Sequence, residues 1–308
     1  NKVEPNPGKG YVWEGENILK TDSILKSAFK YGGDDFGMVM VIEPSRHRKI
    51  NIDDGNKVYL KNFIRAAVER YNGDGINDFD TNIKVKYWQA SNEPFLFDEW
   101  FKQGGTIEGY ADFVRLMSEA VKSVDPKAKI VLGAETAIKD QKLLSDNMKL
   151  VIAALNQEKV FDVVDVHFWG TAGRYNMEIA REMRLYLDKL GYTNVEIWSM
   201  ENGTYINDPE GPLPLQTEKE QAISLIKRYV YNLAHDVDKI FWNNLVEWDC
   251  FAGRCGGQFD NMGLISDGKN SGETLDTLGV PRLSYYSYKI MTEKLEGSDW
   301  DNIQRIHE

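Results

Sequence analysis

The sequence is poor in the residues that build disulfide frameworks and transition-metal sites. It has 2 cysteines and 4 histidines in 308 residues. Cys250 and Cys255 do not have CxxC spacing, and their pairing stays open: a local disulfide suits an exported protein, and two free thiols suit the cytoplasm. The histidines are far apart and form no HxxxH pair (His47, His167, His235 and His307). We therefore expect no zinc centre, and we predict no metal and no other cofactor.

Positive charge and long apolar runs are also scarce. The chain has 37 Lys and Arg against 48 Asp and Glu, a net charge of −11. Without a basic surface to neutralise phosphates, we expect neither nucleic acid nor an anionic membrane as a partner. No stretch approaches the roughly 20 apolar residues of a membrane-spanning helix. The GxGxxG, P-loop and GxSxG motifs are missing too, which argues against dinucleotide-binding, NTPase and serine-hydrolase chemistry.

What the sequence does contain is an alternation of short apolar runs with longer segments of helical periodicity. The runs, rich in Val, Ile and Phe, are predicted strands: 36–42, 83–90, 129–133, 161–168, 195–200 and 239–246. The predicted helices are 24–31, 58–71, 110–124, 140–157, 176–190, 218–235 and 285–295. Repeated βα units predict a parallel sheet. Because the Rossmann fingerprint is missing, we predict an α/β fold of the (β/α)8 TIM-barrel class, in one catalytic domain over residues 1–308.

Polar residues stand where several predicted strands end, which is where barrel enzymes place their active groups. The second run ends in Ser91-Asn92-Glu93-Pro94, and the fifth ends in Met200-Glu201-Asn202-Gly203. His167 and Trp169 close the fourth run, and Trp242 and Trp248 belong to the sixth run and its loop. Two carboxylates in an aromatic-lined mouth suit glycoside hydrolysis, because one can protonate the leaving oxygen while the other attacks the anomeric carbon.

These segments resemble a known family. Trp88-Gln-Ala-Ser-Asn92-Glu93-Pro94 resembles the Asn-Glu-Pro signature on strand four of clan A glycoside hydrolases. The segment Ile197-Trp-Ser-Met-Glu201-Asn-Gly203 resembles the strand-seven nucleophile segment of that clan, and its Glu201 is 108 residues after Glu93 with two predicted strands between. The tail, residues 262–268 and 284–289, is similar to the end of cellulase-like and β-xylosidase-like members. The resemblance covers most of the chain, from about Val12 to the last predicted helix.

The resemblance implies a role for each matching residue. Glu93 would be the general acid/base and Glu201 the nucleophile of a retaining glycosidase, with the two carboxyl groups about 5–5.5 Å apart. Asn92 would hydrogen-bond the sugar 2-hydroxyl, and His167 would lie at the strand-six rim. One position departs from the pattern: many relatives have a Tyr two residues after the strand-six His, where this chain has Trp169. Tyr205 is the candidate to supply the missing hydroxyl.

The expected substrate is an oligo- or polysaccharide with β-glycosidic bonds, and sugar identity, linkage, exo or endo action and oligomeric state stay open. Trp169, Tyr205, Trp242 and Trp248 are the candidate sugar contacts beside Asn92 and His167. The alternative function is a non-catalytic carbohydrate-binding or structural barrel of the same fold. We expect an extracellular protein, with the cytoplasm as the alternative.

Two further expectations concern the first third of the chain. Residues 71–80 gather Asp and Asn oxygens around glycines, which fits a calcium loop or an Asp/Asn/Gly turn, and the missing terminal Glu of a calcium loop favours the turn. If Glu93 ends strand four, the first visible run is strand three. We therefore expect the barrel to lack its first one or two strands here: either roughly 40 to 70 residues are absent, or another segment closes the sheet.

Overall fold

The structure is a computed structural model that describes residues 11, 13, 16–32, 36–43, 54–96, 99–137, 145–173, 178–207, 214–247, 257–269 and 277–299. Trp248, Cys250 and Cys255 lie outside the described residues. Residues 1–10, which bear on the strands expected to be missing, lie outside them as well. Within the described part, no helix is long and apolar enough to cross a membrane.

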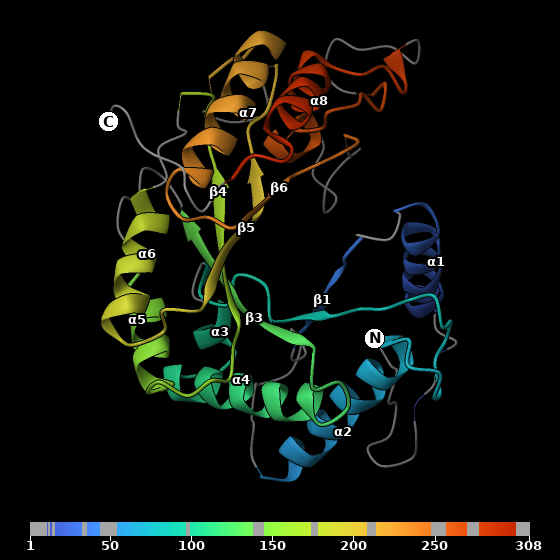
Figure 1. The fold of residues 1–308 in the computed structure, drawn as a ribbon, viewed down its shortest axis with the longest axis vertical. Coiled ribbons are helices and arrows are strands. Elements are labelled where there is room, and N and C mark those ends of the chain that lie inside the picture. The colour runs from blue at the N-terminus through green and yellow to red at the C-terminus, as the bar shows by residue number, and fades with distance from the viewer. Residues whose placement is uncertain are drawn as a thin grey trace. The chain divides into compact units, whose positions relative to one another are not determined.

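Strands and helices alternate along the described chain, as the periodicity predicts (Figure 1). One sheet has the strand order β1-β2-β3-β4-β5-β6, in which β1 with β2, β2 with β3 and β5 with β6 pair in parallel. The strands are β1 (Val39–Ile42), β2 (Tyr87–Ala90), β3 (Lys129–Ala137), β4 (Val163–Trp169), β5 (Glu196–Gly203) and β6 (Lys239–Trp242). The helices are α1 (Glu16–Tyr31), α2 (Asp54–Tyr71), α3 (Glu99–Lys102), α4 (Ile107–Lys122), α5 (Asp146–Ala154), α6 (Glu178–Lys189), α7 (Glu218–Leu233) and α8 (Leu283–Leu295), with a 3-10 turn η3 (Gln258–Asn261). The predicted α/β fold of the (β/α)8 class is confirmed.

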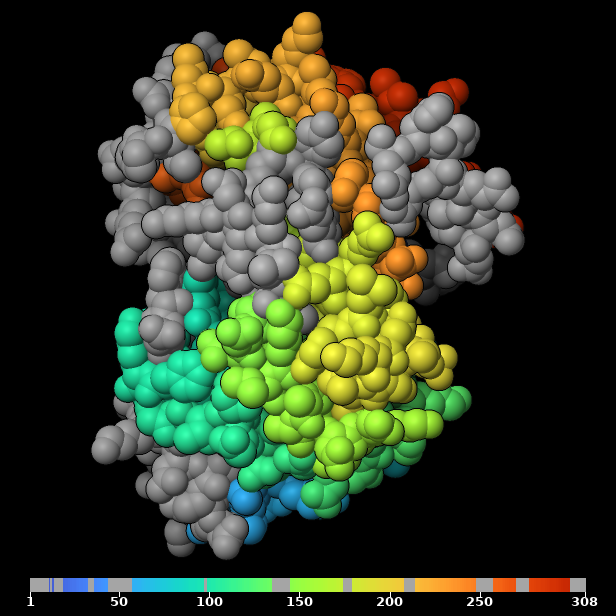
Figure 2. Space-filling view, turned by 90° about the vertical axis from the view of Figure 1, so that its left-hand side faces the viewer, coloured from blue at the N-terminus to red at the C-terminus, as the bar shows by residue number. Residues whose placement is uncertain are grey.

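The residues divide into two units. Unit 1 consists of Asn1–Ala134, Asp146–Val164 and Leu190–Val195, and unit 2 of Glu135–Ser145, Asp165–Lys189 and Glu196–Glu308. In unit 1, α4 packs against α2 and α5, and Figure 2 shows atoms of α4 and α5 next to one another at the surface. Thr106 caps the start of α4, because its side chain accepts the Gly109 N–H. The buried stripe of α4 includes Phe113, Met117 and Val121, so this helix supplies much of the core of the unit.

Unit 2 has its own core between α7, α8 and the chain around β6. Leu225, Tyr229, Leu264 and Met291 are buried together, and α7 and α8 lie side by side (Figure 1). Arg282, just before α8, donates two hydrogen bonds to Glu247 at 2.8 and 2.5 Å and a third to Glu218 at 2.9 Å. These hydrogen bonds hold the buried Glu247 carboxyl group, after β6, against the start of α8.

Several elements begin or end at other residues than predicted, and two of these differences have a cause in the hydrogen bonding. The last predicted strand was expected to run to Val246, but β6 ends at Trp242. The reason is that the following residues bond to another segment: Leu264 N–H donates to the Asn244 carbonyl, and Ile265 N–H donates to the Leu245 carbonyl. The stretch between the predicted strand 83–90 and the predicted helix 110–124 contains the additional short helix α3, whose Trp100 is buried and donates its indole N–H to the Thr106 carbonyl.

Candidate active site

Glu201 lies near the carboxyl end of β5, in a stretch where the strand pairing is irregular. Ser199 pairs with Ile240 and Asn202 pairs with Trp242, so two residues of β5 stand opposite one residue of β6. This is a β-bulge, a feature that bends a strand and changes the direction of the side chains within it. The Glu201 side chain is about one-third exposed (31%), which leaves its carboxyl group accessible to a ligand.

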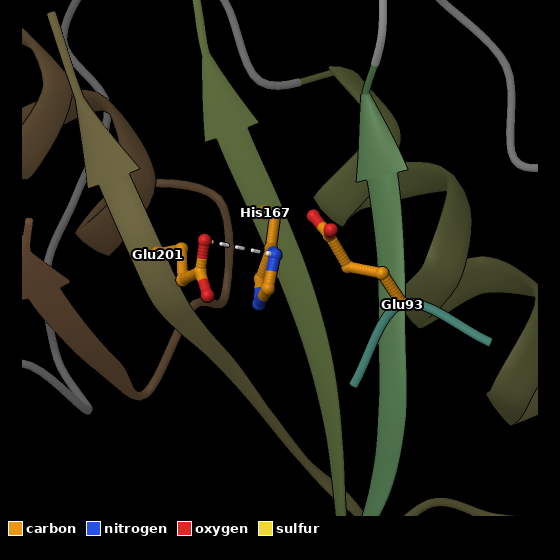
Figure 3. Close-up of side chains that lie close together, drawn as sticks. All are labelled: Glu93, His167 and Glu201. Carbon is orange, nitrogen blue, oxygen red and sulfur yellow. Dashed lines mark ion pairs between the residues drawn. The ribbon is translucent and has the colours of Figure 1, made fainter. Parts of the chain in front are cut away.

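The Glu201 carboxyl group faces a buried histidine on the neighbouring strand. Nδ1 of His167, on β4, is 3.5 Å from Oε2 of Glu201, and Figure 3 shows the ring and the carboxyl group turned toward each other. Nε2 of the same ring is 2.9 Å from Oδ2 of Asp165. Asp165 and His167 are both essentially without exposure, at 0% and 1%. Both ring nitrogens of His167 therefore face carboxylates, within unit 2 alone.

Behind these strand ends lies Arg228, a fully buried residue of α7. Its guanidinium donates to the Phe168 carbonyl at 3.0 Å, to Oδ1 of Asn202 at 3.2 Å and to the Thr171 carbonyl at 3.1 Å. Phe168 and Asn202 are the direct neighbours of His167 and Glu201 in the sequence. Because a buried guanidinium must satisfy its donors, Arg228 fixes the backbone of β4 and the side chain of Asn202 from the helix side.

The other predicted catalytic residue belongs to unit 1. Glu93 follows β2, is half-buried and has a positive φ of 44°, and Ser91 before it has a φ of 64°. The carboxylate of Glu43, just after β1, accepts the Ser91 hydroxyl at 2.9 Å and the Asn92 N–H at 2.7 Å. Left-handed backbone at non-glycine residues is unfavourable and occurs where surrounding contacts hold it. Glu43 supplies such contacts to the segment that carries Asn92 and Glu93. Figure 3 also draws Glu93.

The aromatic residues predicted to contact sugar differ from one another in their surroundings. Trp169, half-buried at the end of β4, packs edge-on against Phe259 with ring centroids 5.1 Å apart. Trp242 donates its indole N–H to the Met262 carbonyl at 3.0 Å and packs against the core of unit 2. Tyr205 is fully buried and donates its hydroxyl proton to the Pro214 carbonyl at 2.8 Å. That single proton is therefore not available to orient Glu201. Trp248 lies outside the described residues.

A glycine allows the chain to pass closely beside this part of unit 2. A Cβ added to Gly203, two residues after Glu201, would be 2.8 Å from the Asn243 carbonyl oxygen and 3.1 Å from the Trp169 ring. Any side chain here would displace backbone that cannot easily move. The glycine of the Glu-Asn-Gly segment is thus required by packing rather than by turn geometry.

Sequence reasoning did not single out Asp165, Arg228 or Glu43. A signal for Asp165 was present in the run Val164-Asp-Val-His167, because residues two apart on a strand share a face. No comparable signal marks Arg228 or Glu43, because their partners are distant in the sequence and depend on how the strands and helices are packed.

The loop before β2 has the hydrogen bonding of a turn. Asp78 accepts the Gly73 and Gly75 N–H groups at 2.9 and 2.6 Å, and Asp74 accepts the Ile76 N–H at 2.9 Å. The Asn82 N–H, bonded to Asp80, lowers the pKa of the Asp80 carboxyl group. These oxygens accept hydrogen bonds from the N–H groups of the loop itself, an arrangement that favours the turn over a calcium loop.

Comparison with solved structures identifies proteins of similar fold. No protein-family model matches the chain, and no curated protein sequence matches it either. A solved glucosidase from Croceicoccus marinus superimposes with a TM-score of 0.57 at 19% identity, over 77% of this chain and 46% of that one. A family 39 glycoside hydrolase from Bacteroides cellulosilyticus WH2 gives 0.63 at 15% identity, over 96% and 56%. A GH10 protein from Paenibacillus barcinonensis gives 0.60 at 16% identity, over 96% and 85%.

The chain spans about half the length of the first two of these structures. At such low identity the likeness concerns the fold and not the activity. The structural neighbours are nevertheless glycoside hydrolases, as the Asn-Glu-Pro and Glu-Asn-Gly segments predict. The chain has the fold of the barrel glycoside hydrolases.

Proposed function

We propose that the protein is a retaining glycoside hydrolase that cleaves β-glycosidic bonds of an oligo- or polysaccharide, with residues 1–308 acting as one catalytic domain. The observation that carries the proposal is the environment of Glu201. In a chain with the fold of glycoside hydrolases, a partly exposed carboxyl group at the end of a parallel strand faces a buried His–Asp pair. Enzymes of this architecture place their reactive groups at that end of the strands.

The reaction would proceed by two displacements. An oxygen of Glu201 attacks the anomeric carbon, the bond to the leaving oxygen breaks, and Glu93 gives that oxygen its proton. Glu93, now a carboxylate, takes a proton from water, whose oxygen attacks the anomeric carbon and breaks the ester bond to Glu201. We include in the proposal that Glu93 and Glu201 lie about 5–5.5 Å apart, the separation that a retaining mechanism requires.

The remaining predicted site residues have supporting roles in this proposal. Asn92, held by Glu43 through its backbone N–H, would bind the sugar 2-hydroxyl. Trp169 would offer an aromatic face to the sugar, because it is half-buried and not wholly enclosed. A polymeric substrate favours an extracellular location, with the cytoplasm as the alternative. Neither a metal nor another cofactor takes part in these steps.

Removal of the nucleophile tests the proposal. E201A should abolish turnover of an activated aryl β-glycoside, and azide should restore product release by attacking the vacated face to give an inverted glycosyl azide. E93A should behave differently: Glu201 still forms the ester, so azide should release a glycosyl azide of retained configuration. E196Q is the matched control, because Glu196 lies on the same strand and bonds the Trp198 indole N–H at 2.8 Å. Unchanged turnover in E201A would refute the proposal.

One observation favours a second function, carbohydrate binding without hydrolysis. In the clan that the sequence resembles, many members have a tyrosine at the position of Trp169, and here the Tyr205 hydroxyl proton is donated to Pro214. Neither position therefore provides a hydroxyl to Glu201. This function predicts that calorimetric titration detects saccharide binding while a broad glycoside panel yields no hydrolysis, and turnover of any panel member that is lost in E201A would exclude it.

A further inference from the structure

Asp165 uses both of its carboxylate oxygens on groups that adjoin the proposed nucleophile. Oδ2 is 2.9 Å from Nε2 of His167, and Oδ1 accepts the Met200 N–H at 2.9 Å. Met200 directly precedes Glu201, and His167 faces it. Asp165 therefore reaches Glu201 by two routes, through the imidazole ring on β4 and through the backbone of β5.

The hydrogen bonds constrain the protons on the His167 ring. A carboxylate only accepts hydrogen bonds, so the contact with Asp165 requires a proton on Nε2. The other nitrogen, Nδ1, then faces Glu201 at 3.5 Å. A neutral ring would present its Nδ1 lone pair to the Glu201 carboxylate, which is repulsive. Only the doubly protonated ring satisfies both carboxylates.

We infer that Asp165 is a positioning residue for the proposed nucleophile: it holds the His167 proton on Nε2, so that a cationic ring faces Glu201, and it fixes the Met200 backbone. This inference rests on the proposed function. A cation facing Glu201 stabilises the charge that the carboxylate carries before attack and regains when the ester breaks. The burial of Asp165 and His167 strengthens the effect, because water does not screen it.

D165N tests the inference with little change of shape. The oxygen of the introduced amide can still accept the Met200 N–H, and the amide nitrogen must then donate to Nε2 of His167, because the reverse orientation would set two donors against each other. Nε2 would lose its proton, and the neutral ring would keep its proton on Nδ1. We expect kcat for an activated aryl β-glycoside to fall about 100-fold, the lower end of the loss seen when one electrostatic stabiliser is removed, with KM changed less than about threefold because the sugar contacts remain.

The control variant is D162N. Asp162 precedes β4, accepts the Ile130 N–H at 2.9 Å and pairs with Lys122 and Lys129, so its replacement removes contacts at the start of the strand and none to His167 or Met200. It should leave kcat unchanged. A double-mutant cycle isolates the path through the ring: D165N added to H167Q should cost much less than D165N costs in the wild type. Unchanged kcat in D165N, or strictly additive effects in the cycle, would overturn the inference.

Nitrogen-15 NMR of the histidine rings gives a readout that is independent of activity. The chain has 4 histidines, so H167Q identifies the His167 signals. The wild type should show a protonated Nε2, and D165N should show an unprotonated one. An unprotonated Nε2 in the wild type would overturn the inference without any need for a folded variant. If the wild type hydrolyses no glycoside, the proposed function fails and the catalytic role of Asp165 fails with it, whereas a wild-type turnover that D165N retains overturns this inference alone.

Discussion

Two buried tyrosines, Tyr71 in unit 1 and Tyr205 in unit 2, donate their hydroxyl protons to different kinds of acceptor. Tyr205 donates to a backbone carbonyl, and Tyr71, at the end of α2, donates to Oδ1 of Asp22 on α1 at 2.7 Å. Arg70 donates to the other oxygen of Asp22 at 2.7 Å. Burial, and next the bond to Asp22, raise the pKa of Tyr71 to about 12. This tyrosine therefore ties two helices together only while it is protonated.

Y71F should lower the free energy of unfolding at pH 7 by about 1 kcal/mol, the usual net value of a lost hydrogen bond. The difference should shrink above pH 10, because the unfolded state ionises at about 10 and the folded state at about 12. The wild type thus loses stability as the pH rises through this window, and Y71F does not lose it for this reason. Urea unfolding at pH 7, 9 and 10.5 measures the difference in the free energy of unfolding between the two proteins and its change with pH. Y31F, at an exposed position (77%), is the control, and a gap that stays constant with pH would contradict the prediction.

At the scale of elements, α7 connects helix formation with the candidate site. It begins in a capping box: the Thr217 side chain accepts the Glu220 N–H at 3.2 Å, and Glu220 accepts the Thr217 N–H at 2.7 Å. The same helix carries Arg228 behind the ends of β4 and β5. The cap fixes where the helix starts, and Arg228 is placed about three turns later.

T217A should lower the free energy of unfolding by about 1 kcal/mol, because it removes an N-cap acceptor. T217S keeps the hydroxyl and should retain most of this stability. The hydrogen bond from the Thr217 N–H lowers the pKa of the Glu220 carboxyl group. The ionised Glu220 therefore stabilises the folded state fully above the ordinary glutamate pKa, and this stabilisation is lost as the pH falls. Denaturant unfolding at pH 7 and at pH 3.5 checks both statements. Equal stability of T217A and T217S would show that the cap contributes nothing.

At the scale of the whole molecule, the proposed reaction uses two carboxyl groups that belong to separate units. Glu93 follows β2 in unit 1, and Glu201 lies near the carboxyl end of β5 in unit 2. Their separation decides the stereochemistry, since about 5–5.5 Å gives retention and about 6.5–9.5 Å gives inversion. The configuration of the product therefore reports on the separation of these two carboxyl groups.

We expect the wild type to release the β-anomer first from an aryl β-glycoside, because two displacements restore the original configuration. Proton NMR during the first minutes of hydrolysis, before mutarotation equilibrates the anomers, observes this directly. E196Q should give the same anomer as the wild type. First release of the α-anomer would mean inversion, and would exclude Glu201 as a nucleophile while leaving hydrolysis itself intact.

The sequence alone determined the order of strands and helices and the polar residues at the strand ends. Local periodicity encodes both, since the apolar run 161–168 can be recognised as the strand around β4 without any knowledge of its neighbours. The Asn-Glu-Pro and Glu-Asn-Gly segments likewise identified the candidate residues Glu93 and Glu201, whose catalytic roles stay a prediction. Less local features were missed: β6 ends early because Leu264 and Ile265 bond to residues 244 and 245.

Only the tertiary structure decided which partner each polar side chain has. In the structure, Tyr205 donates its hydroxyl proton to Pro214 and Arg282 donates hydrogen bonds to Glu247. The ring nitrogens of His167 face Asp165 and Glu201. These contacts join residues whose proximity depends on strand register, on the bulge in β5 and on the packing of α7. Hydrogen bonds form over about 3 Å, so small changes in that packing reassign them. A linear pattern of residues does not specify geometry at this scale, and the folded chain does.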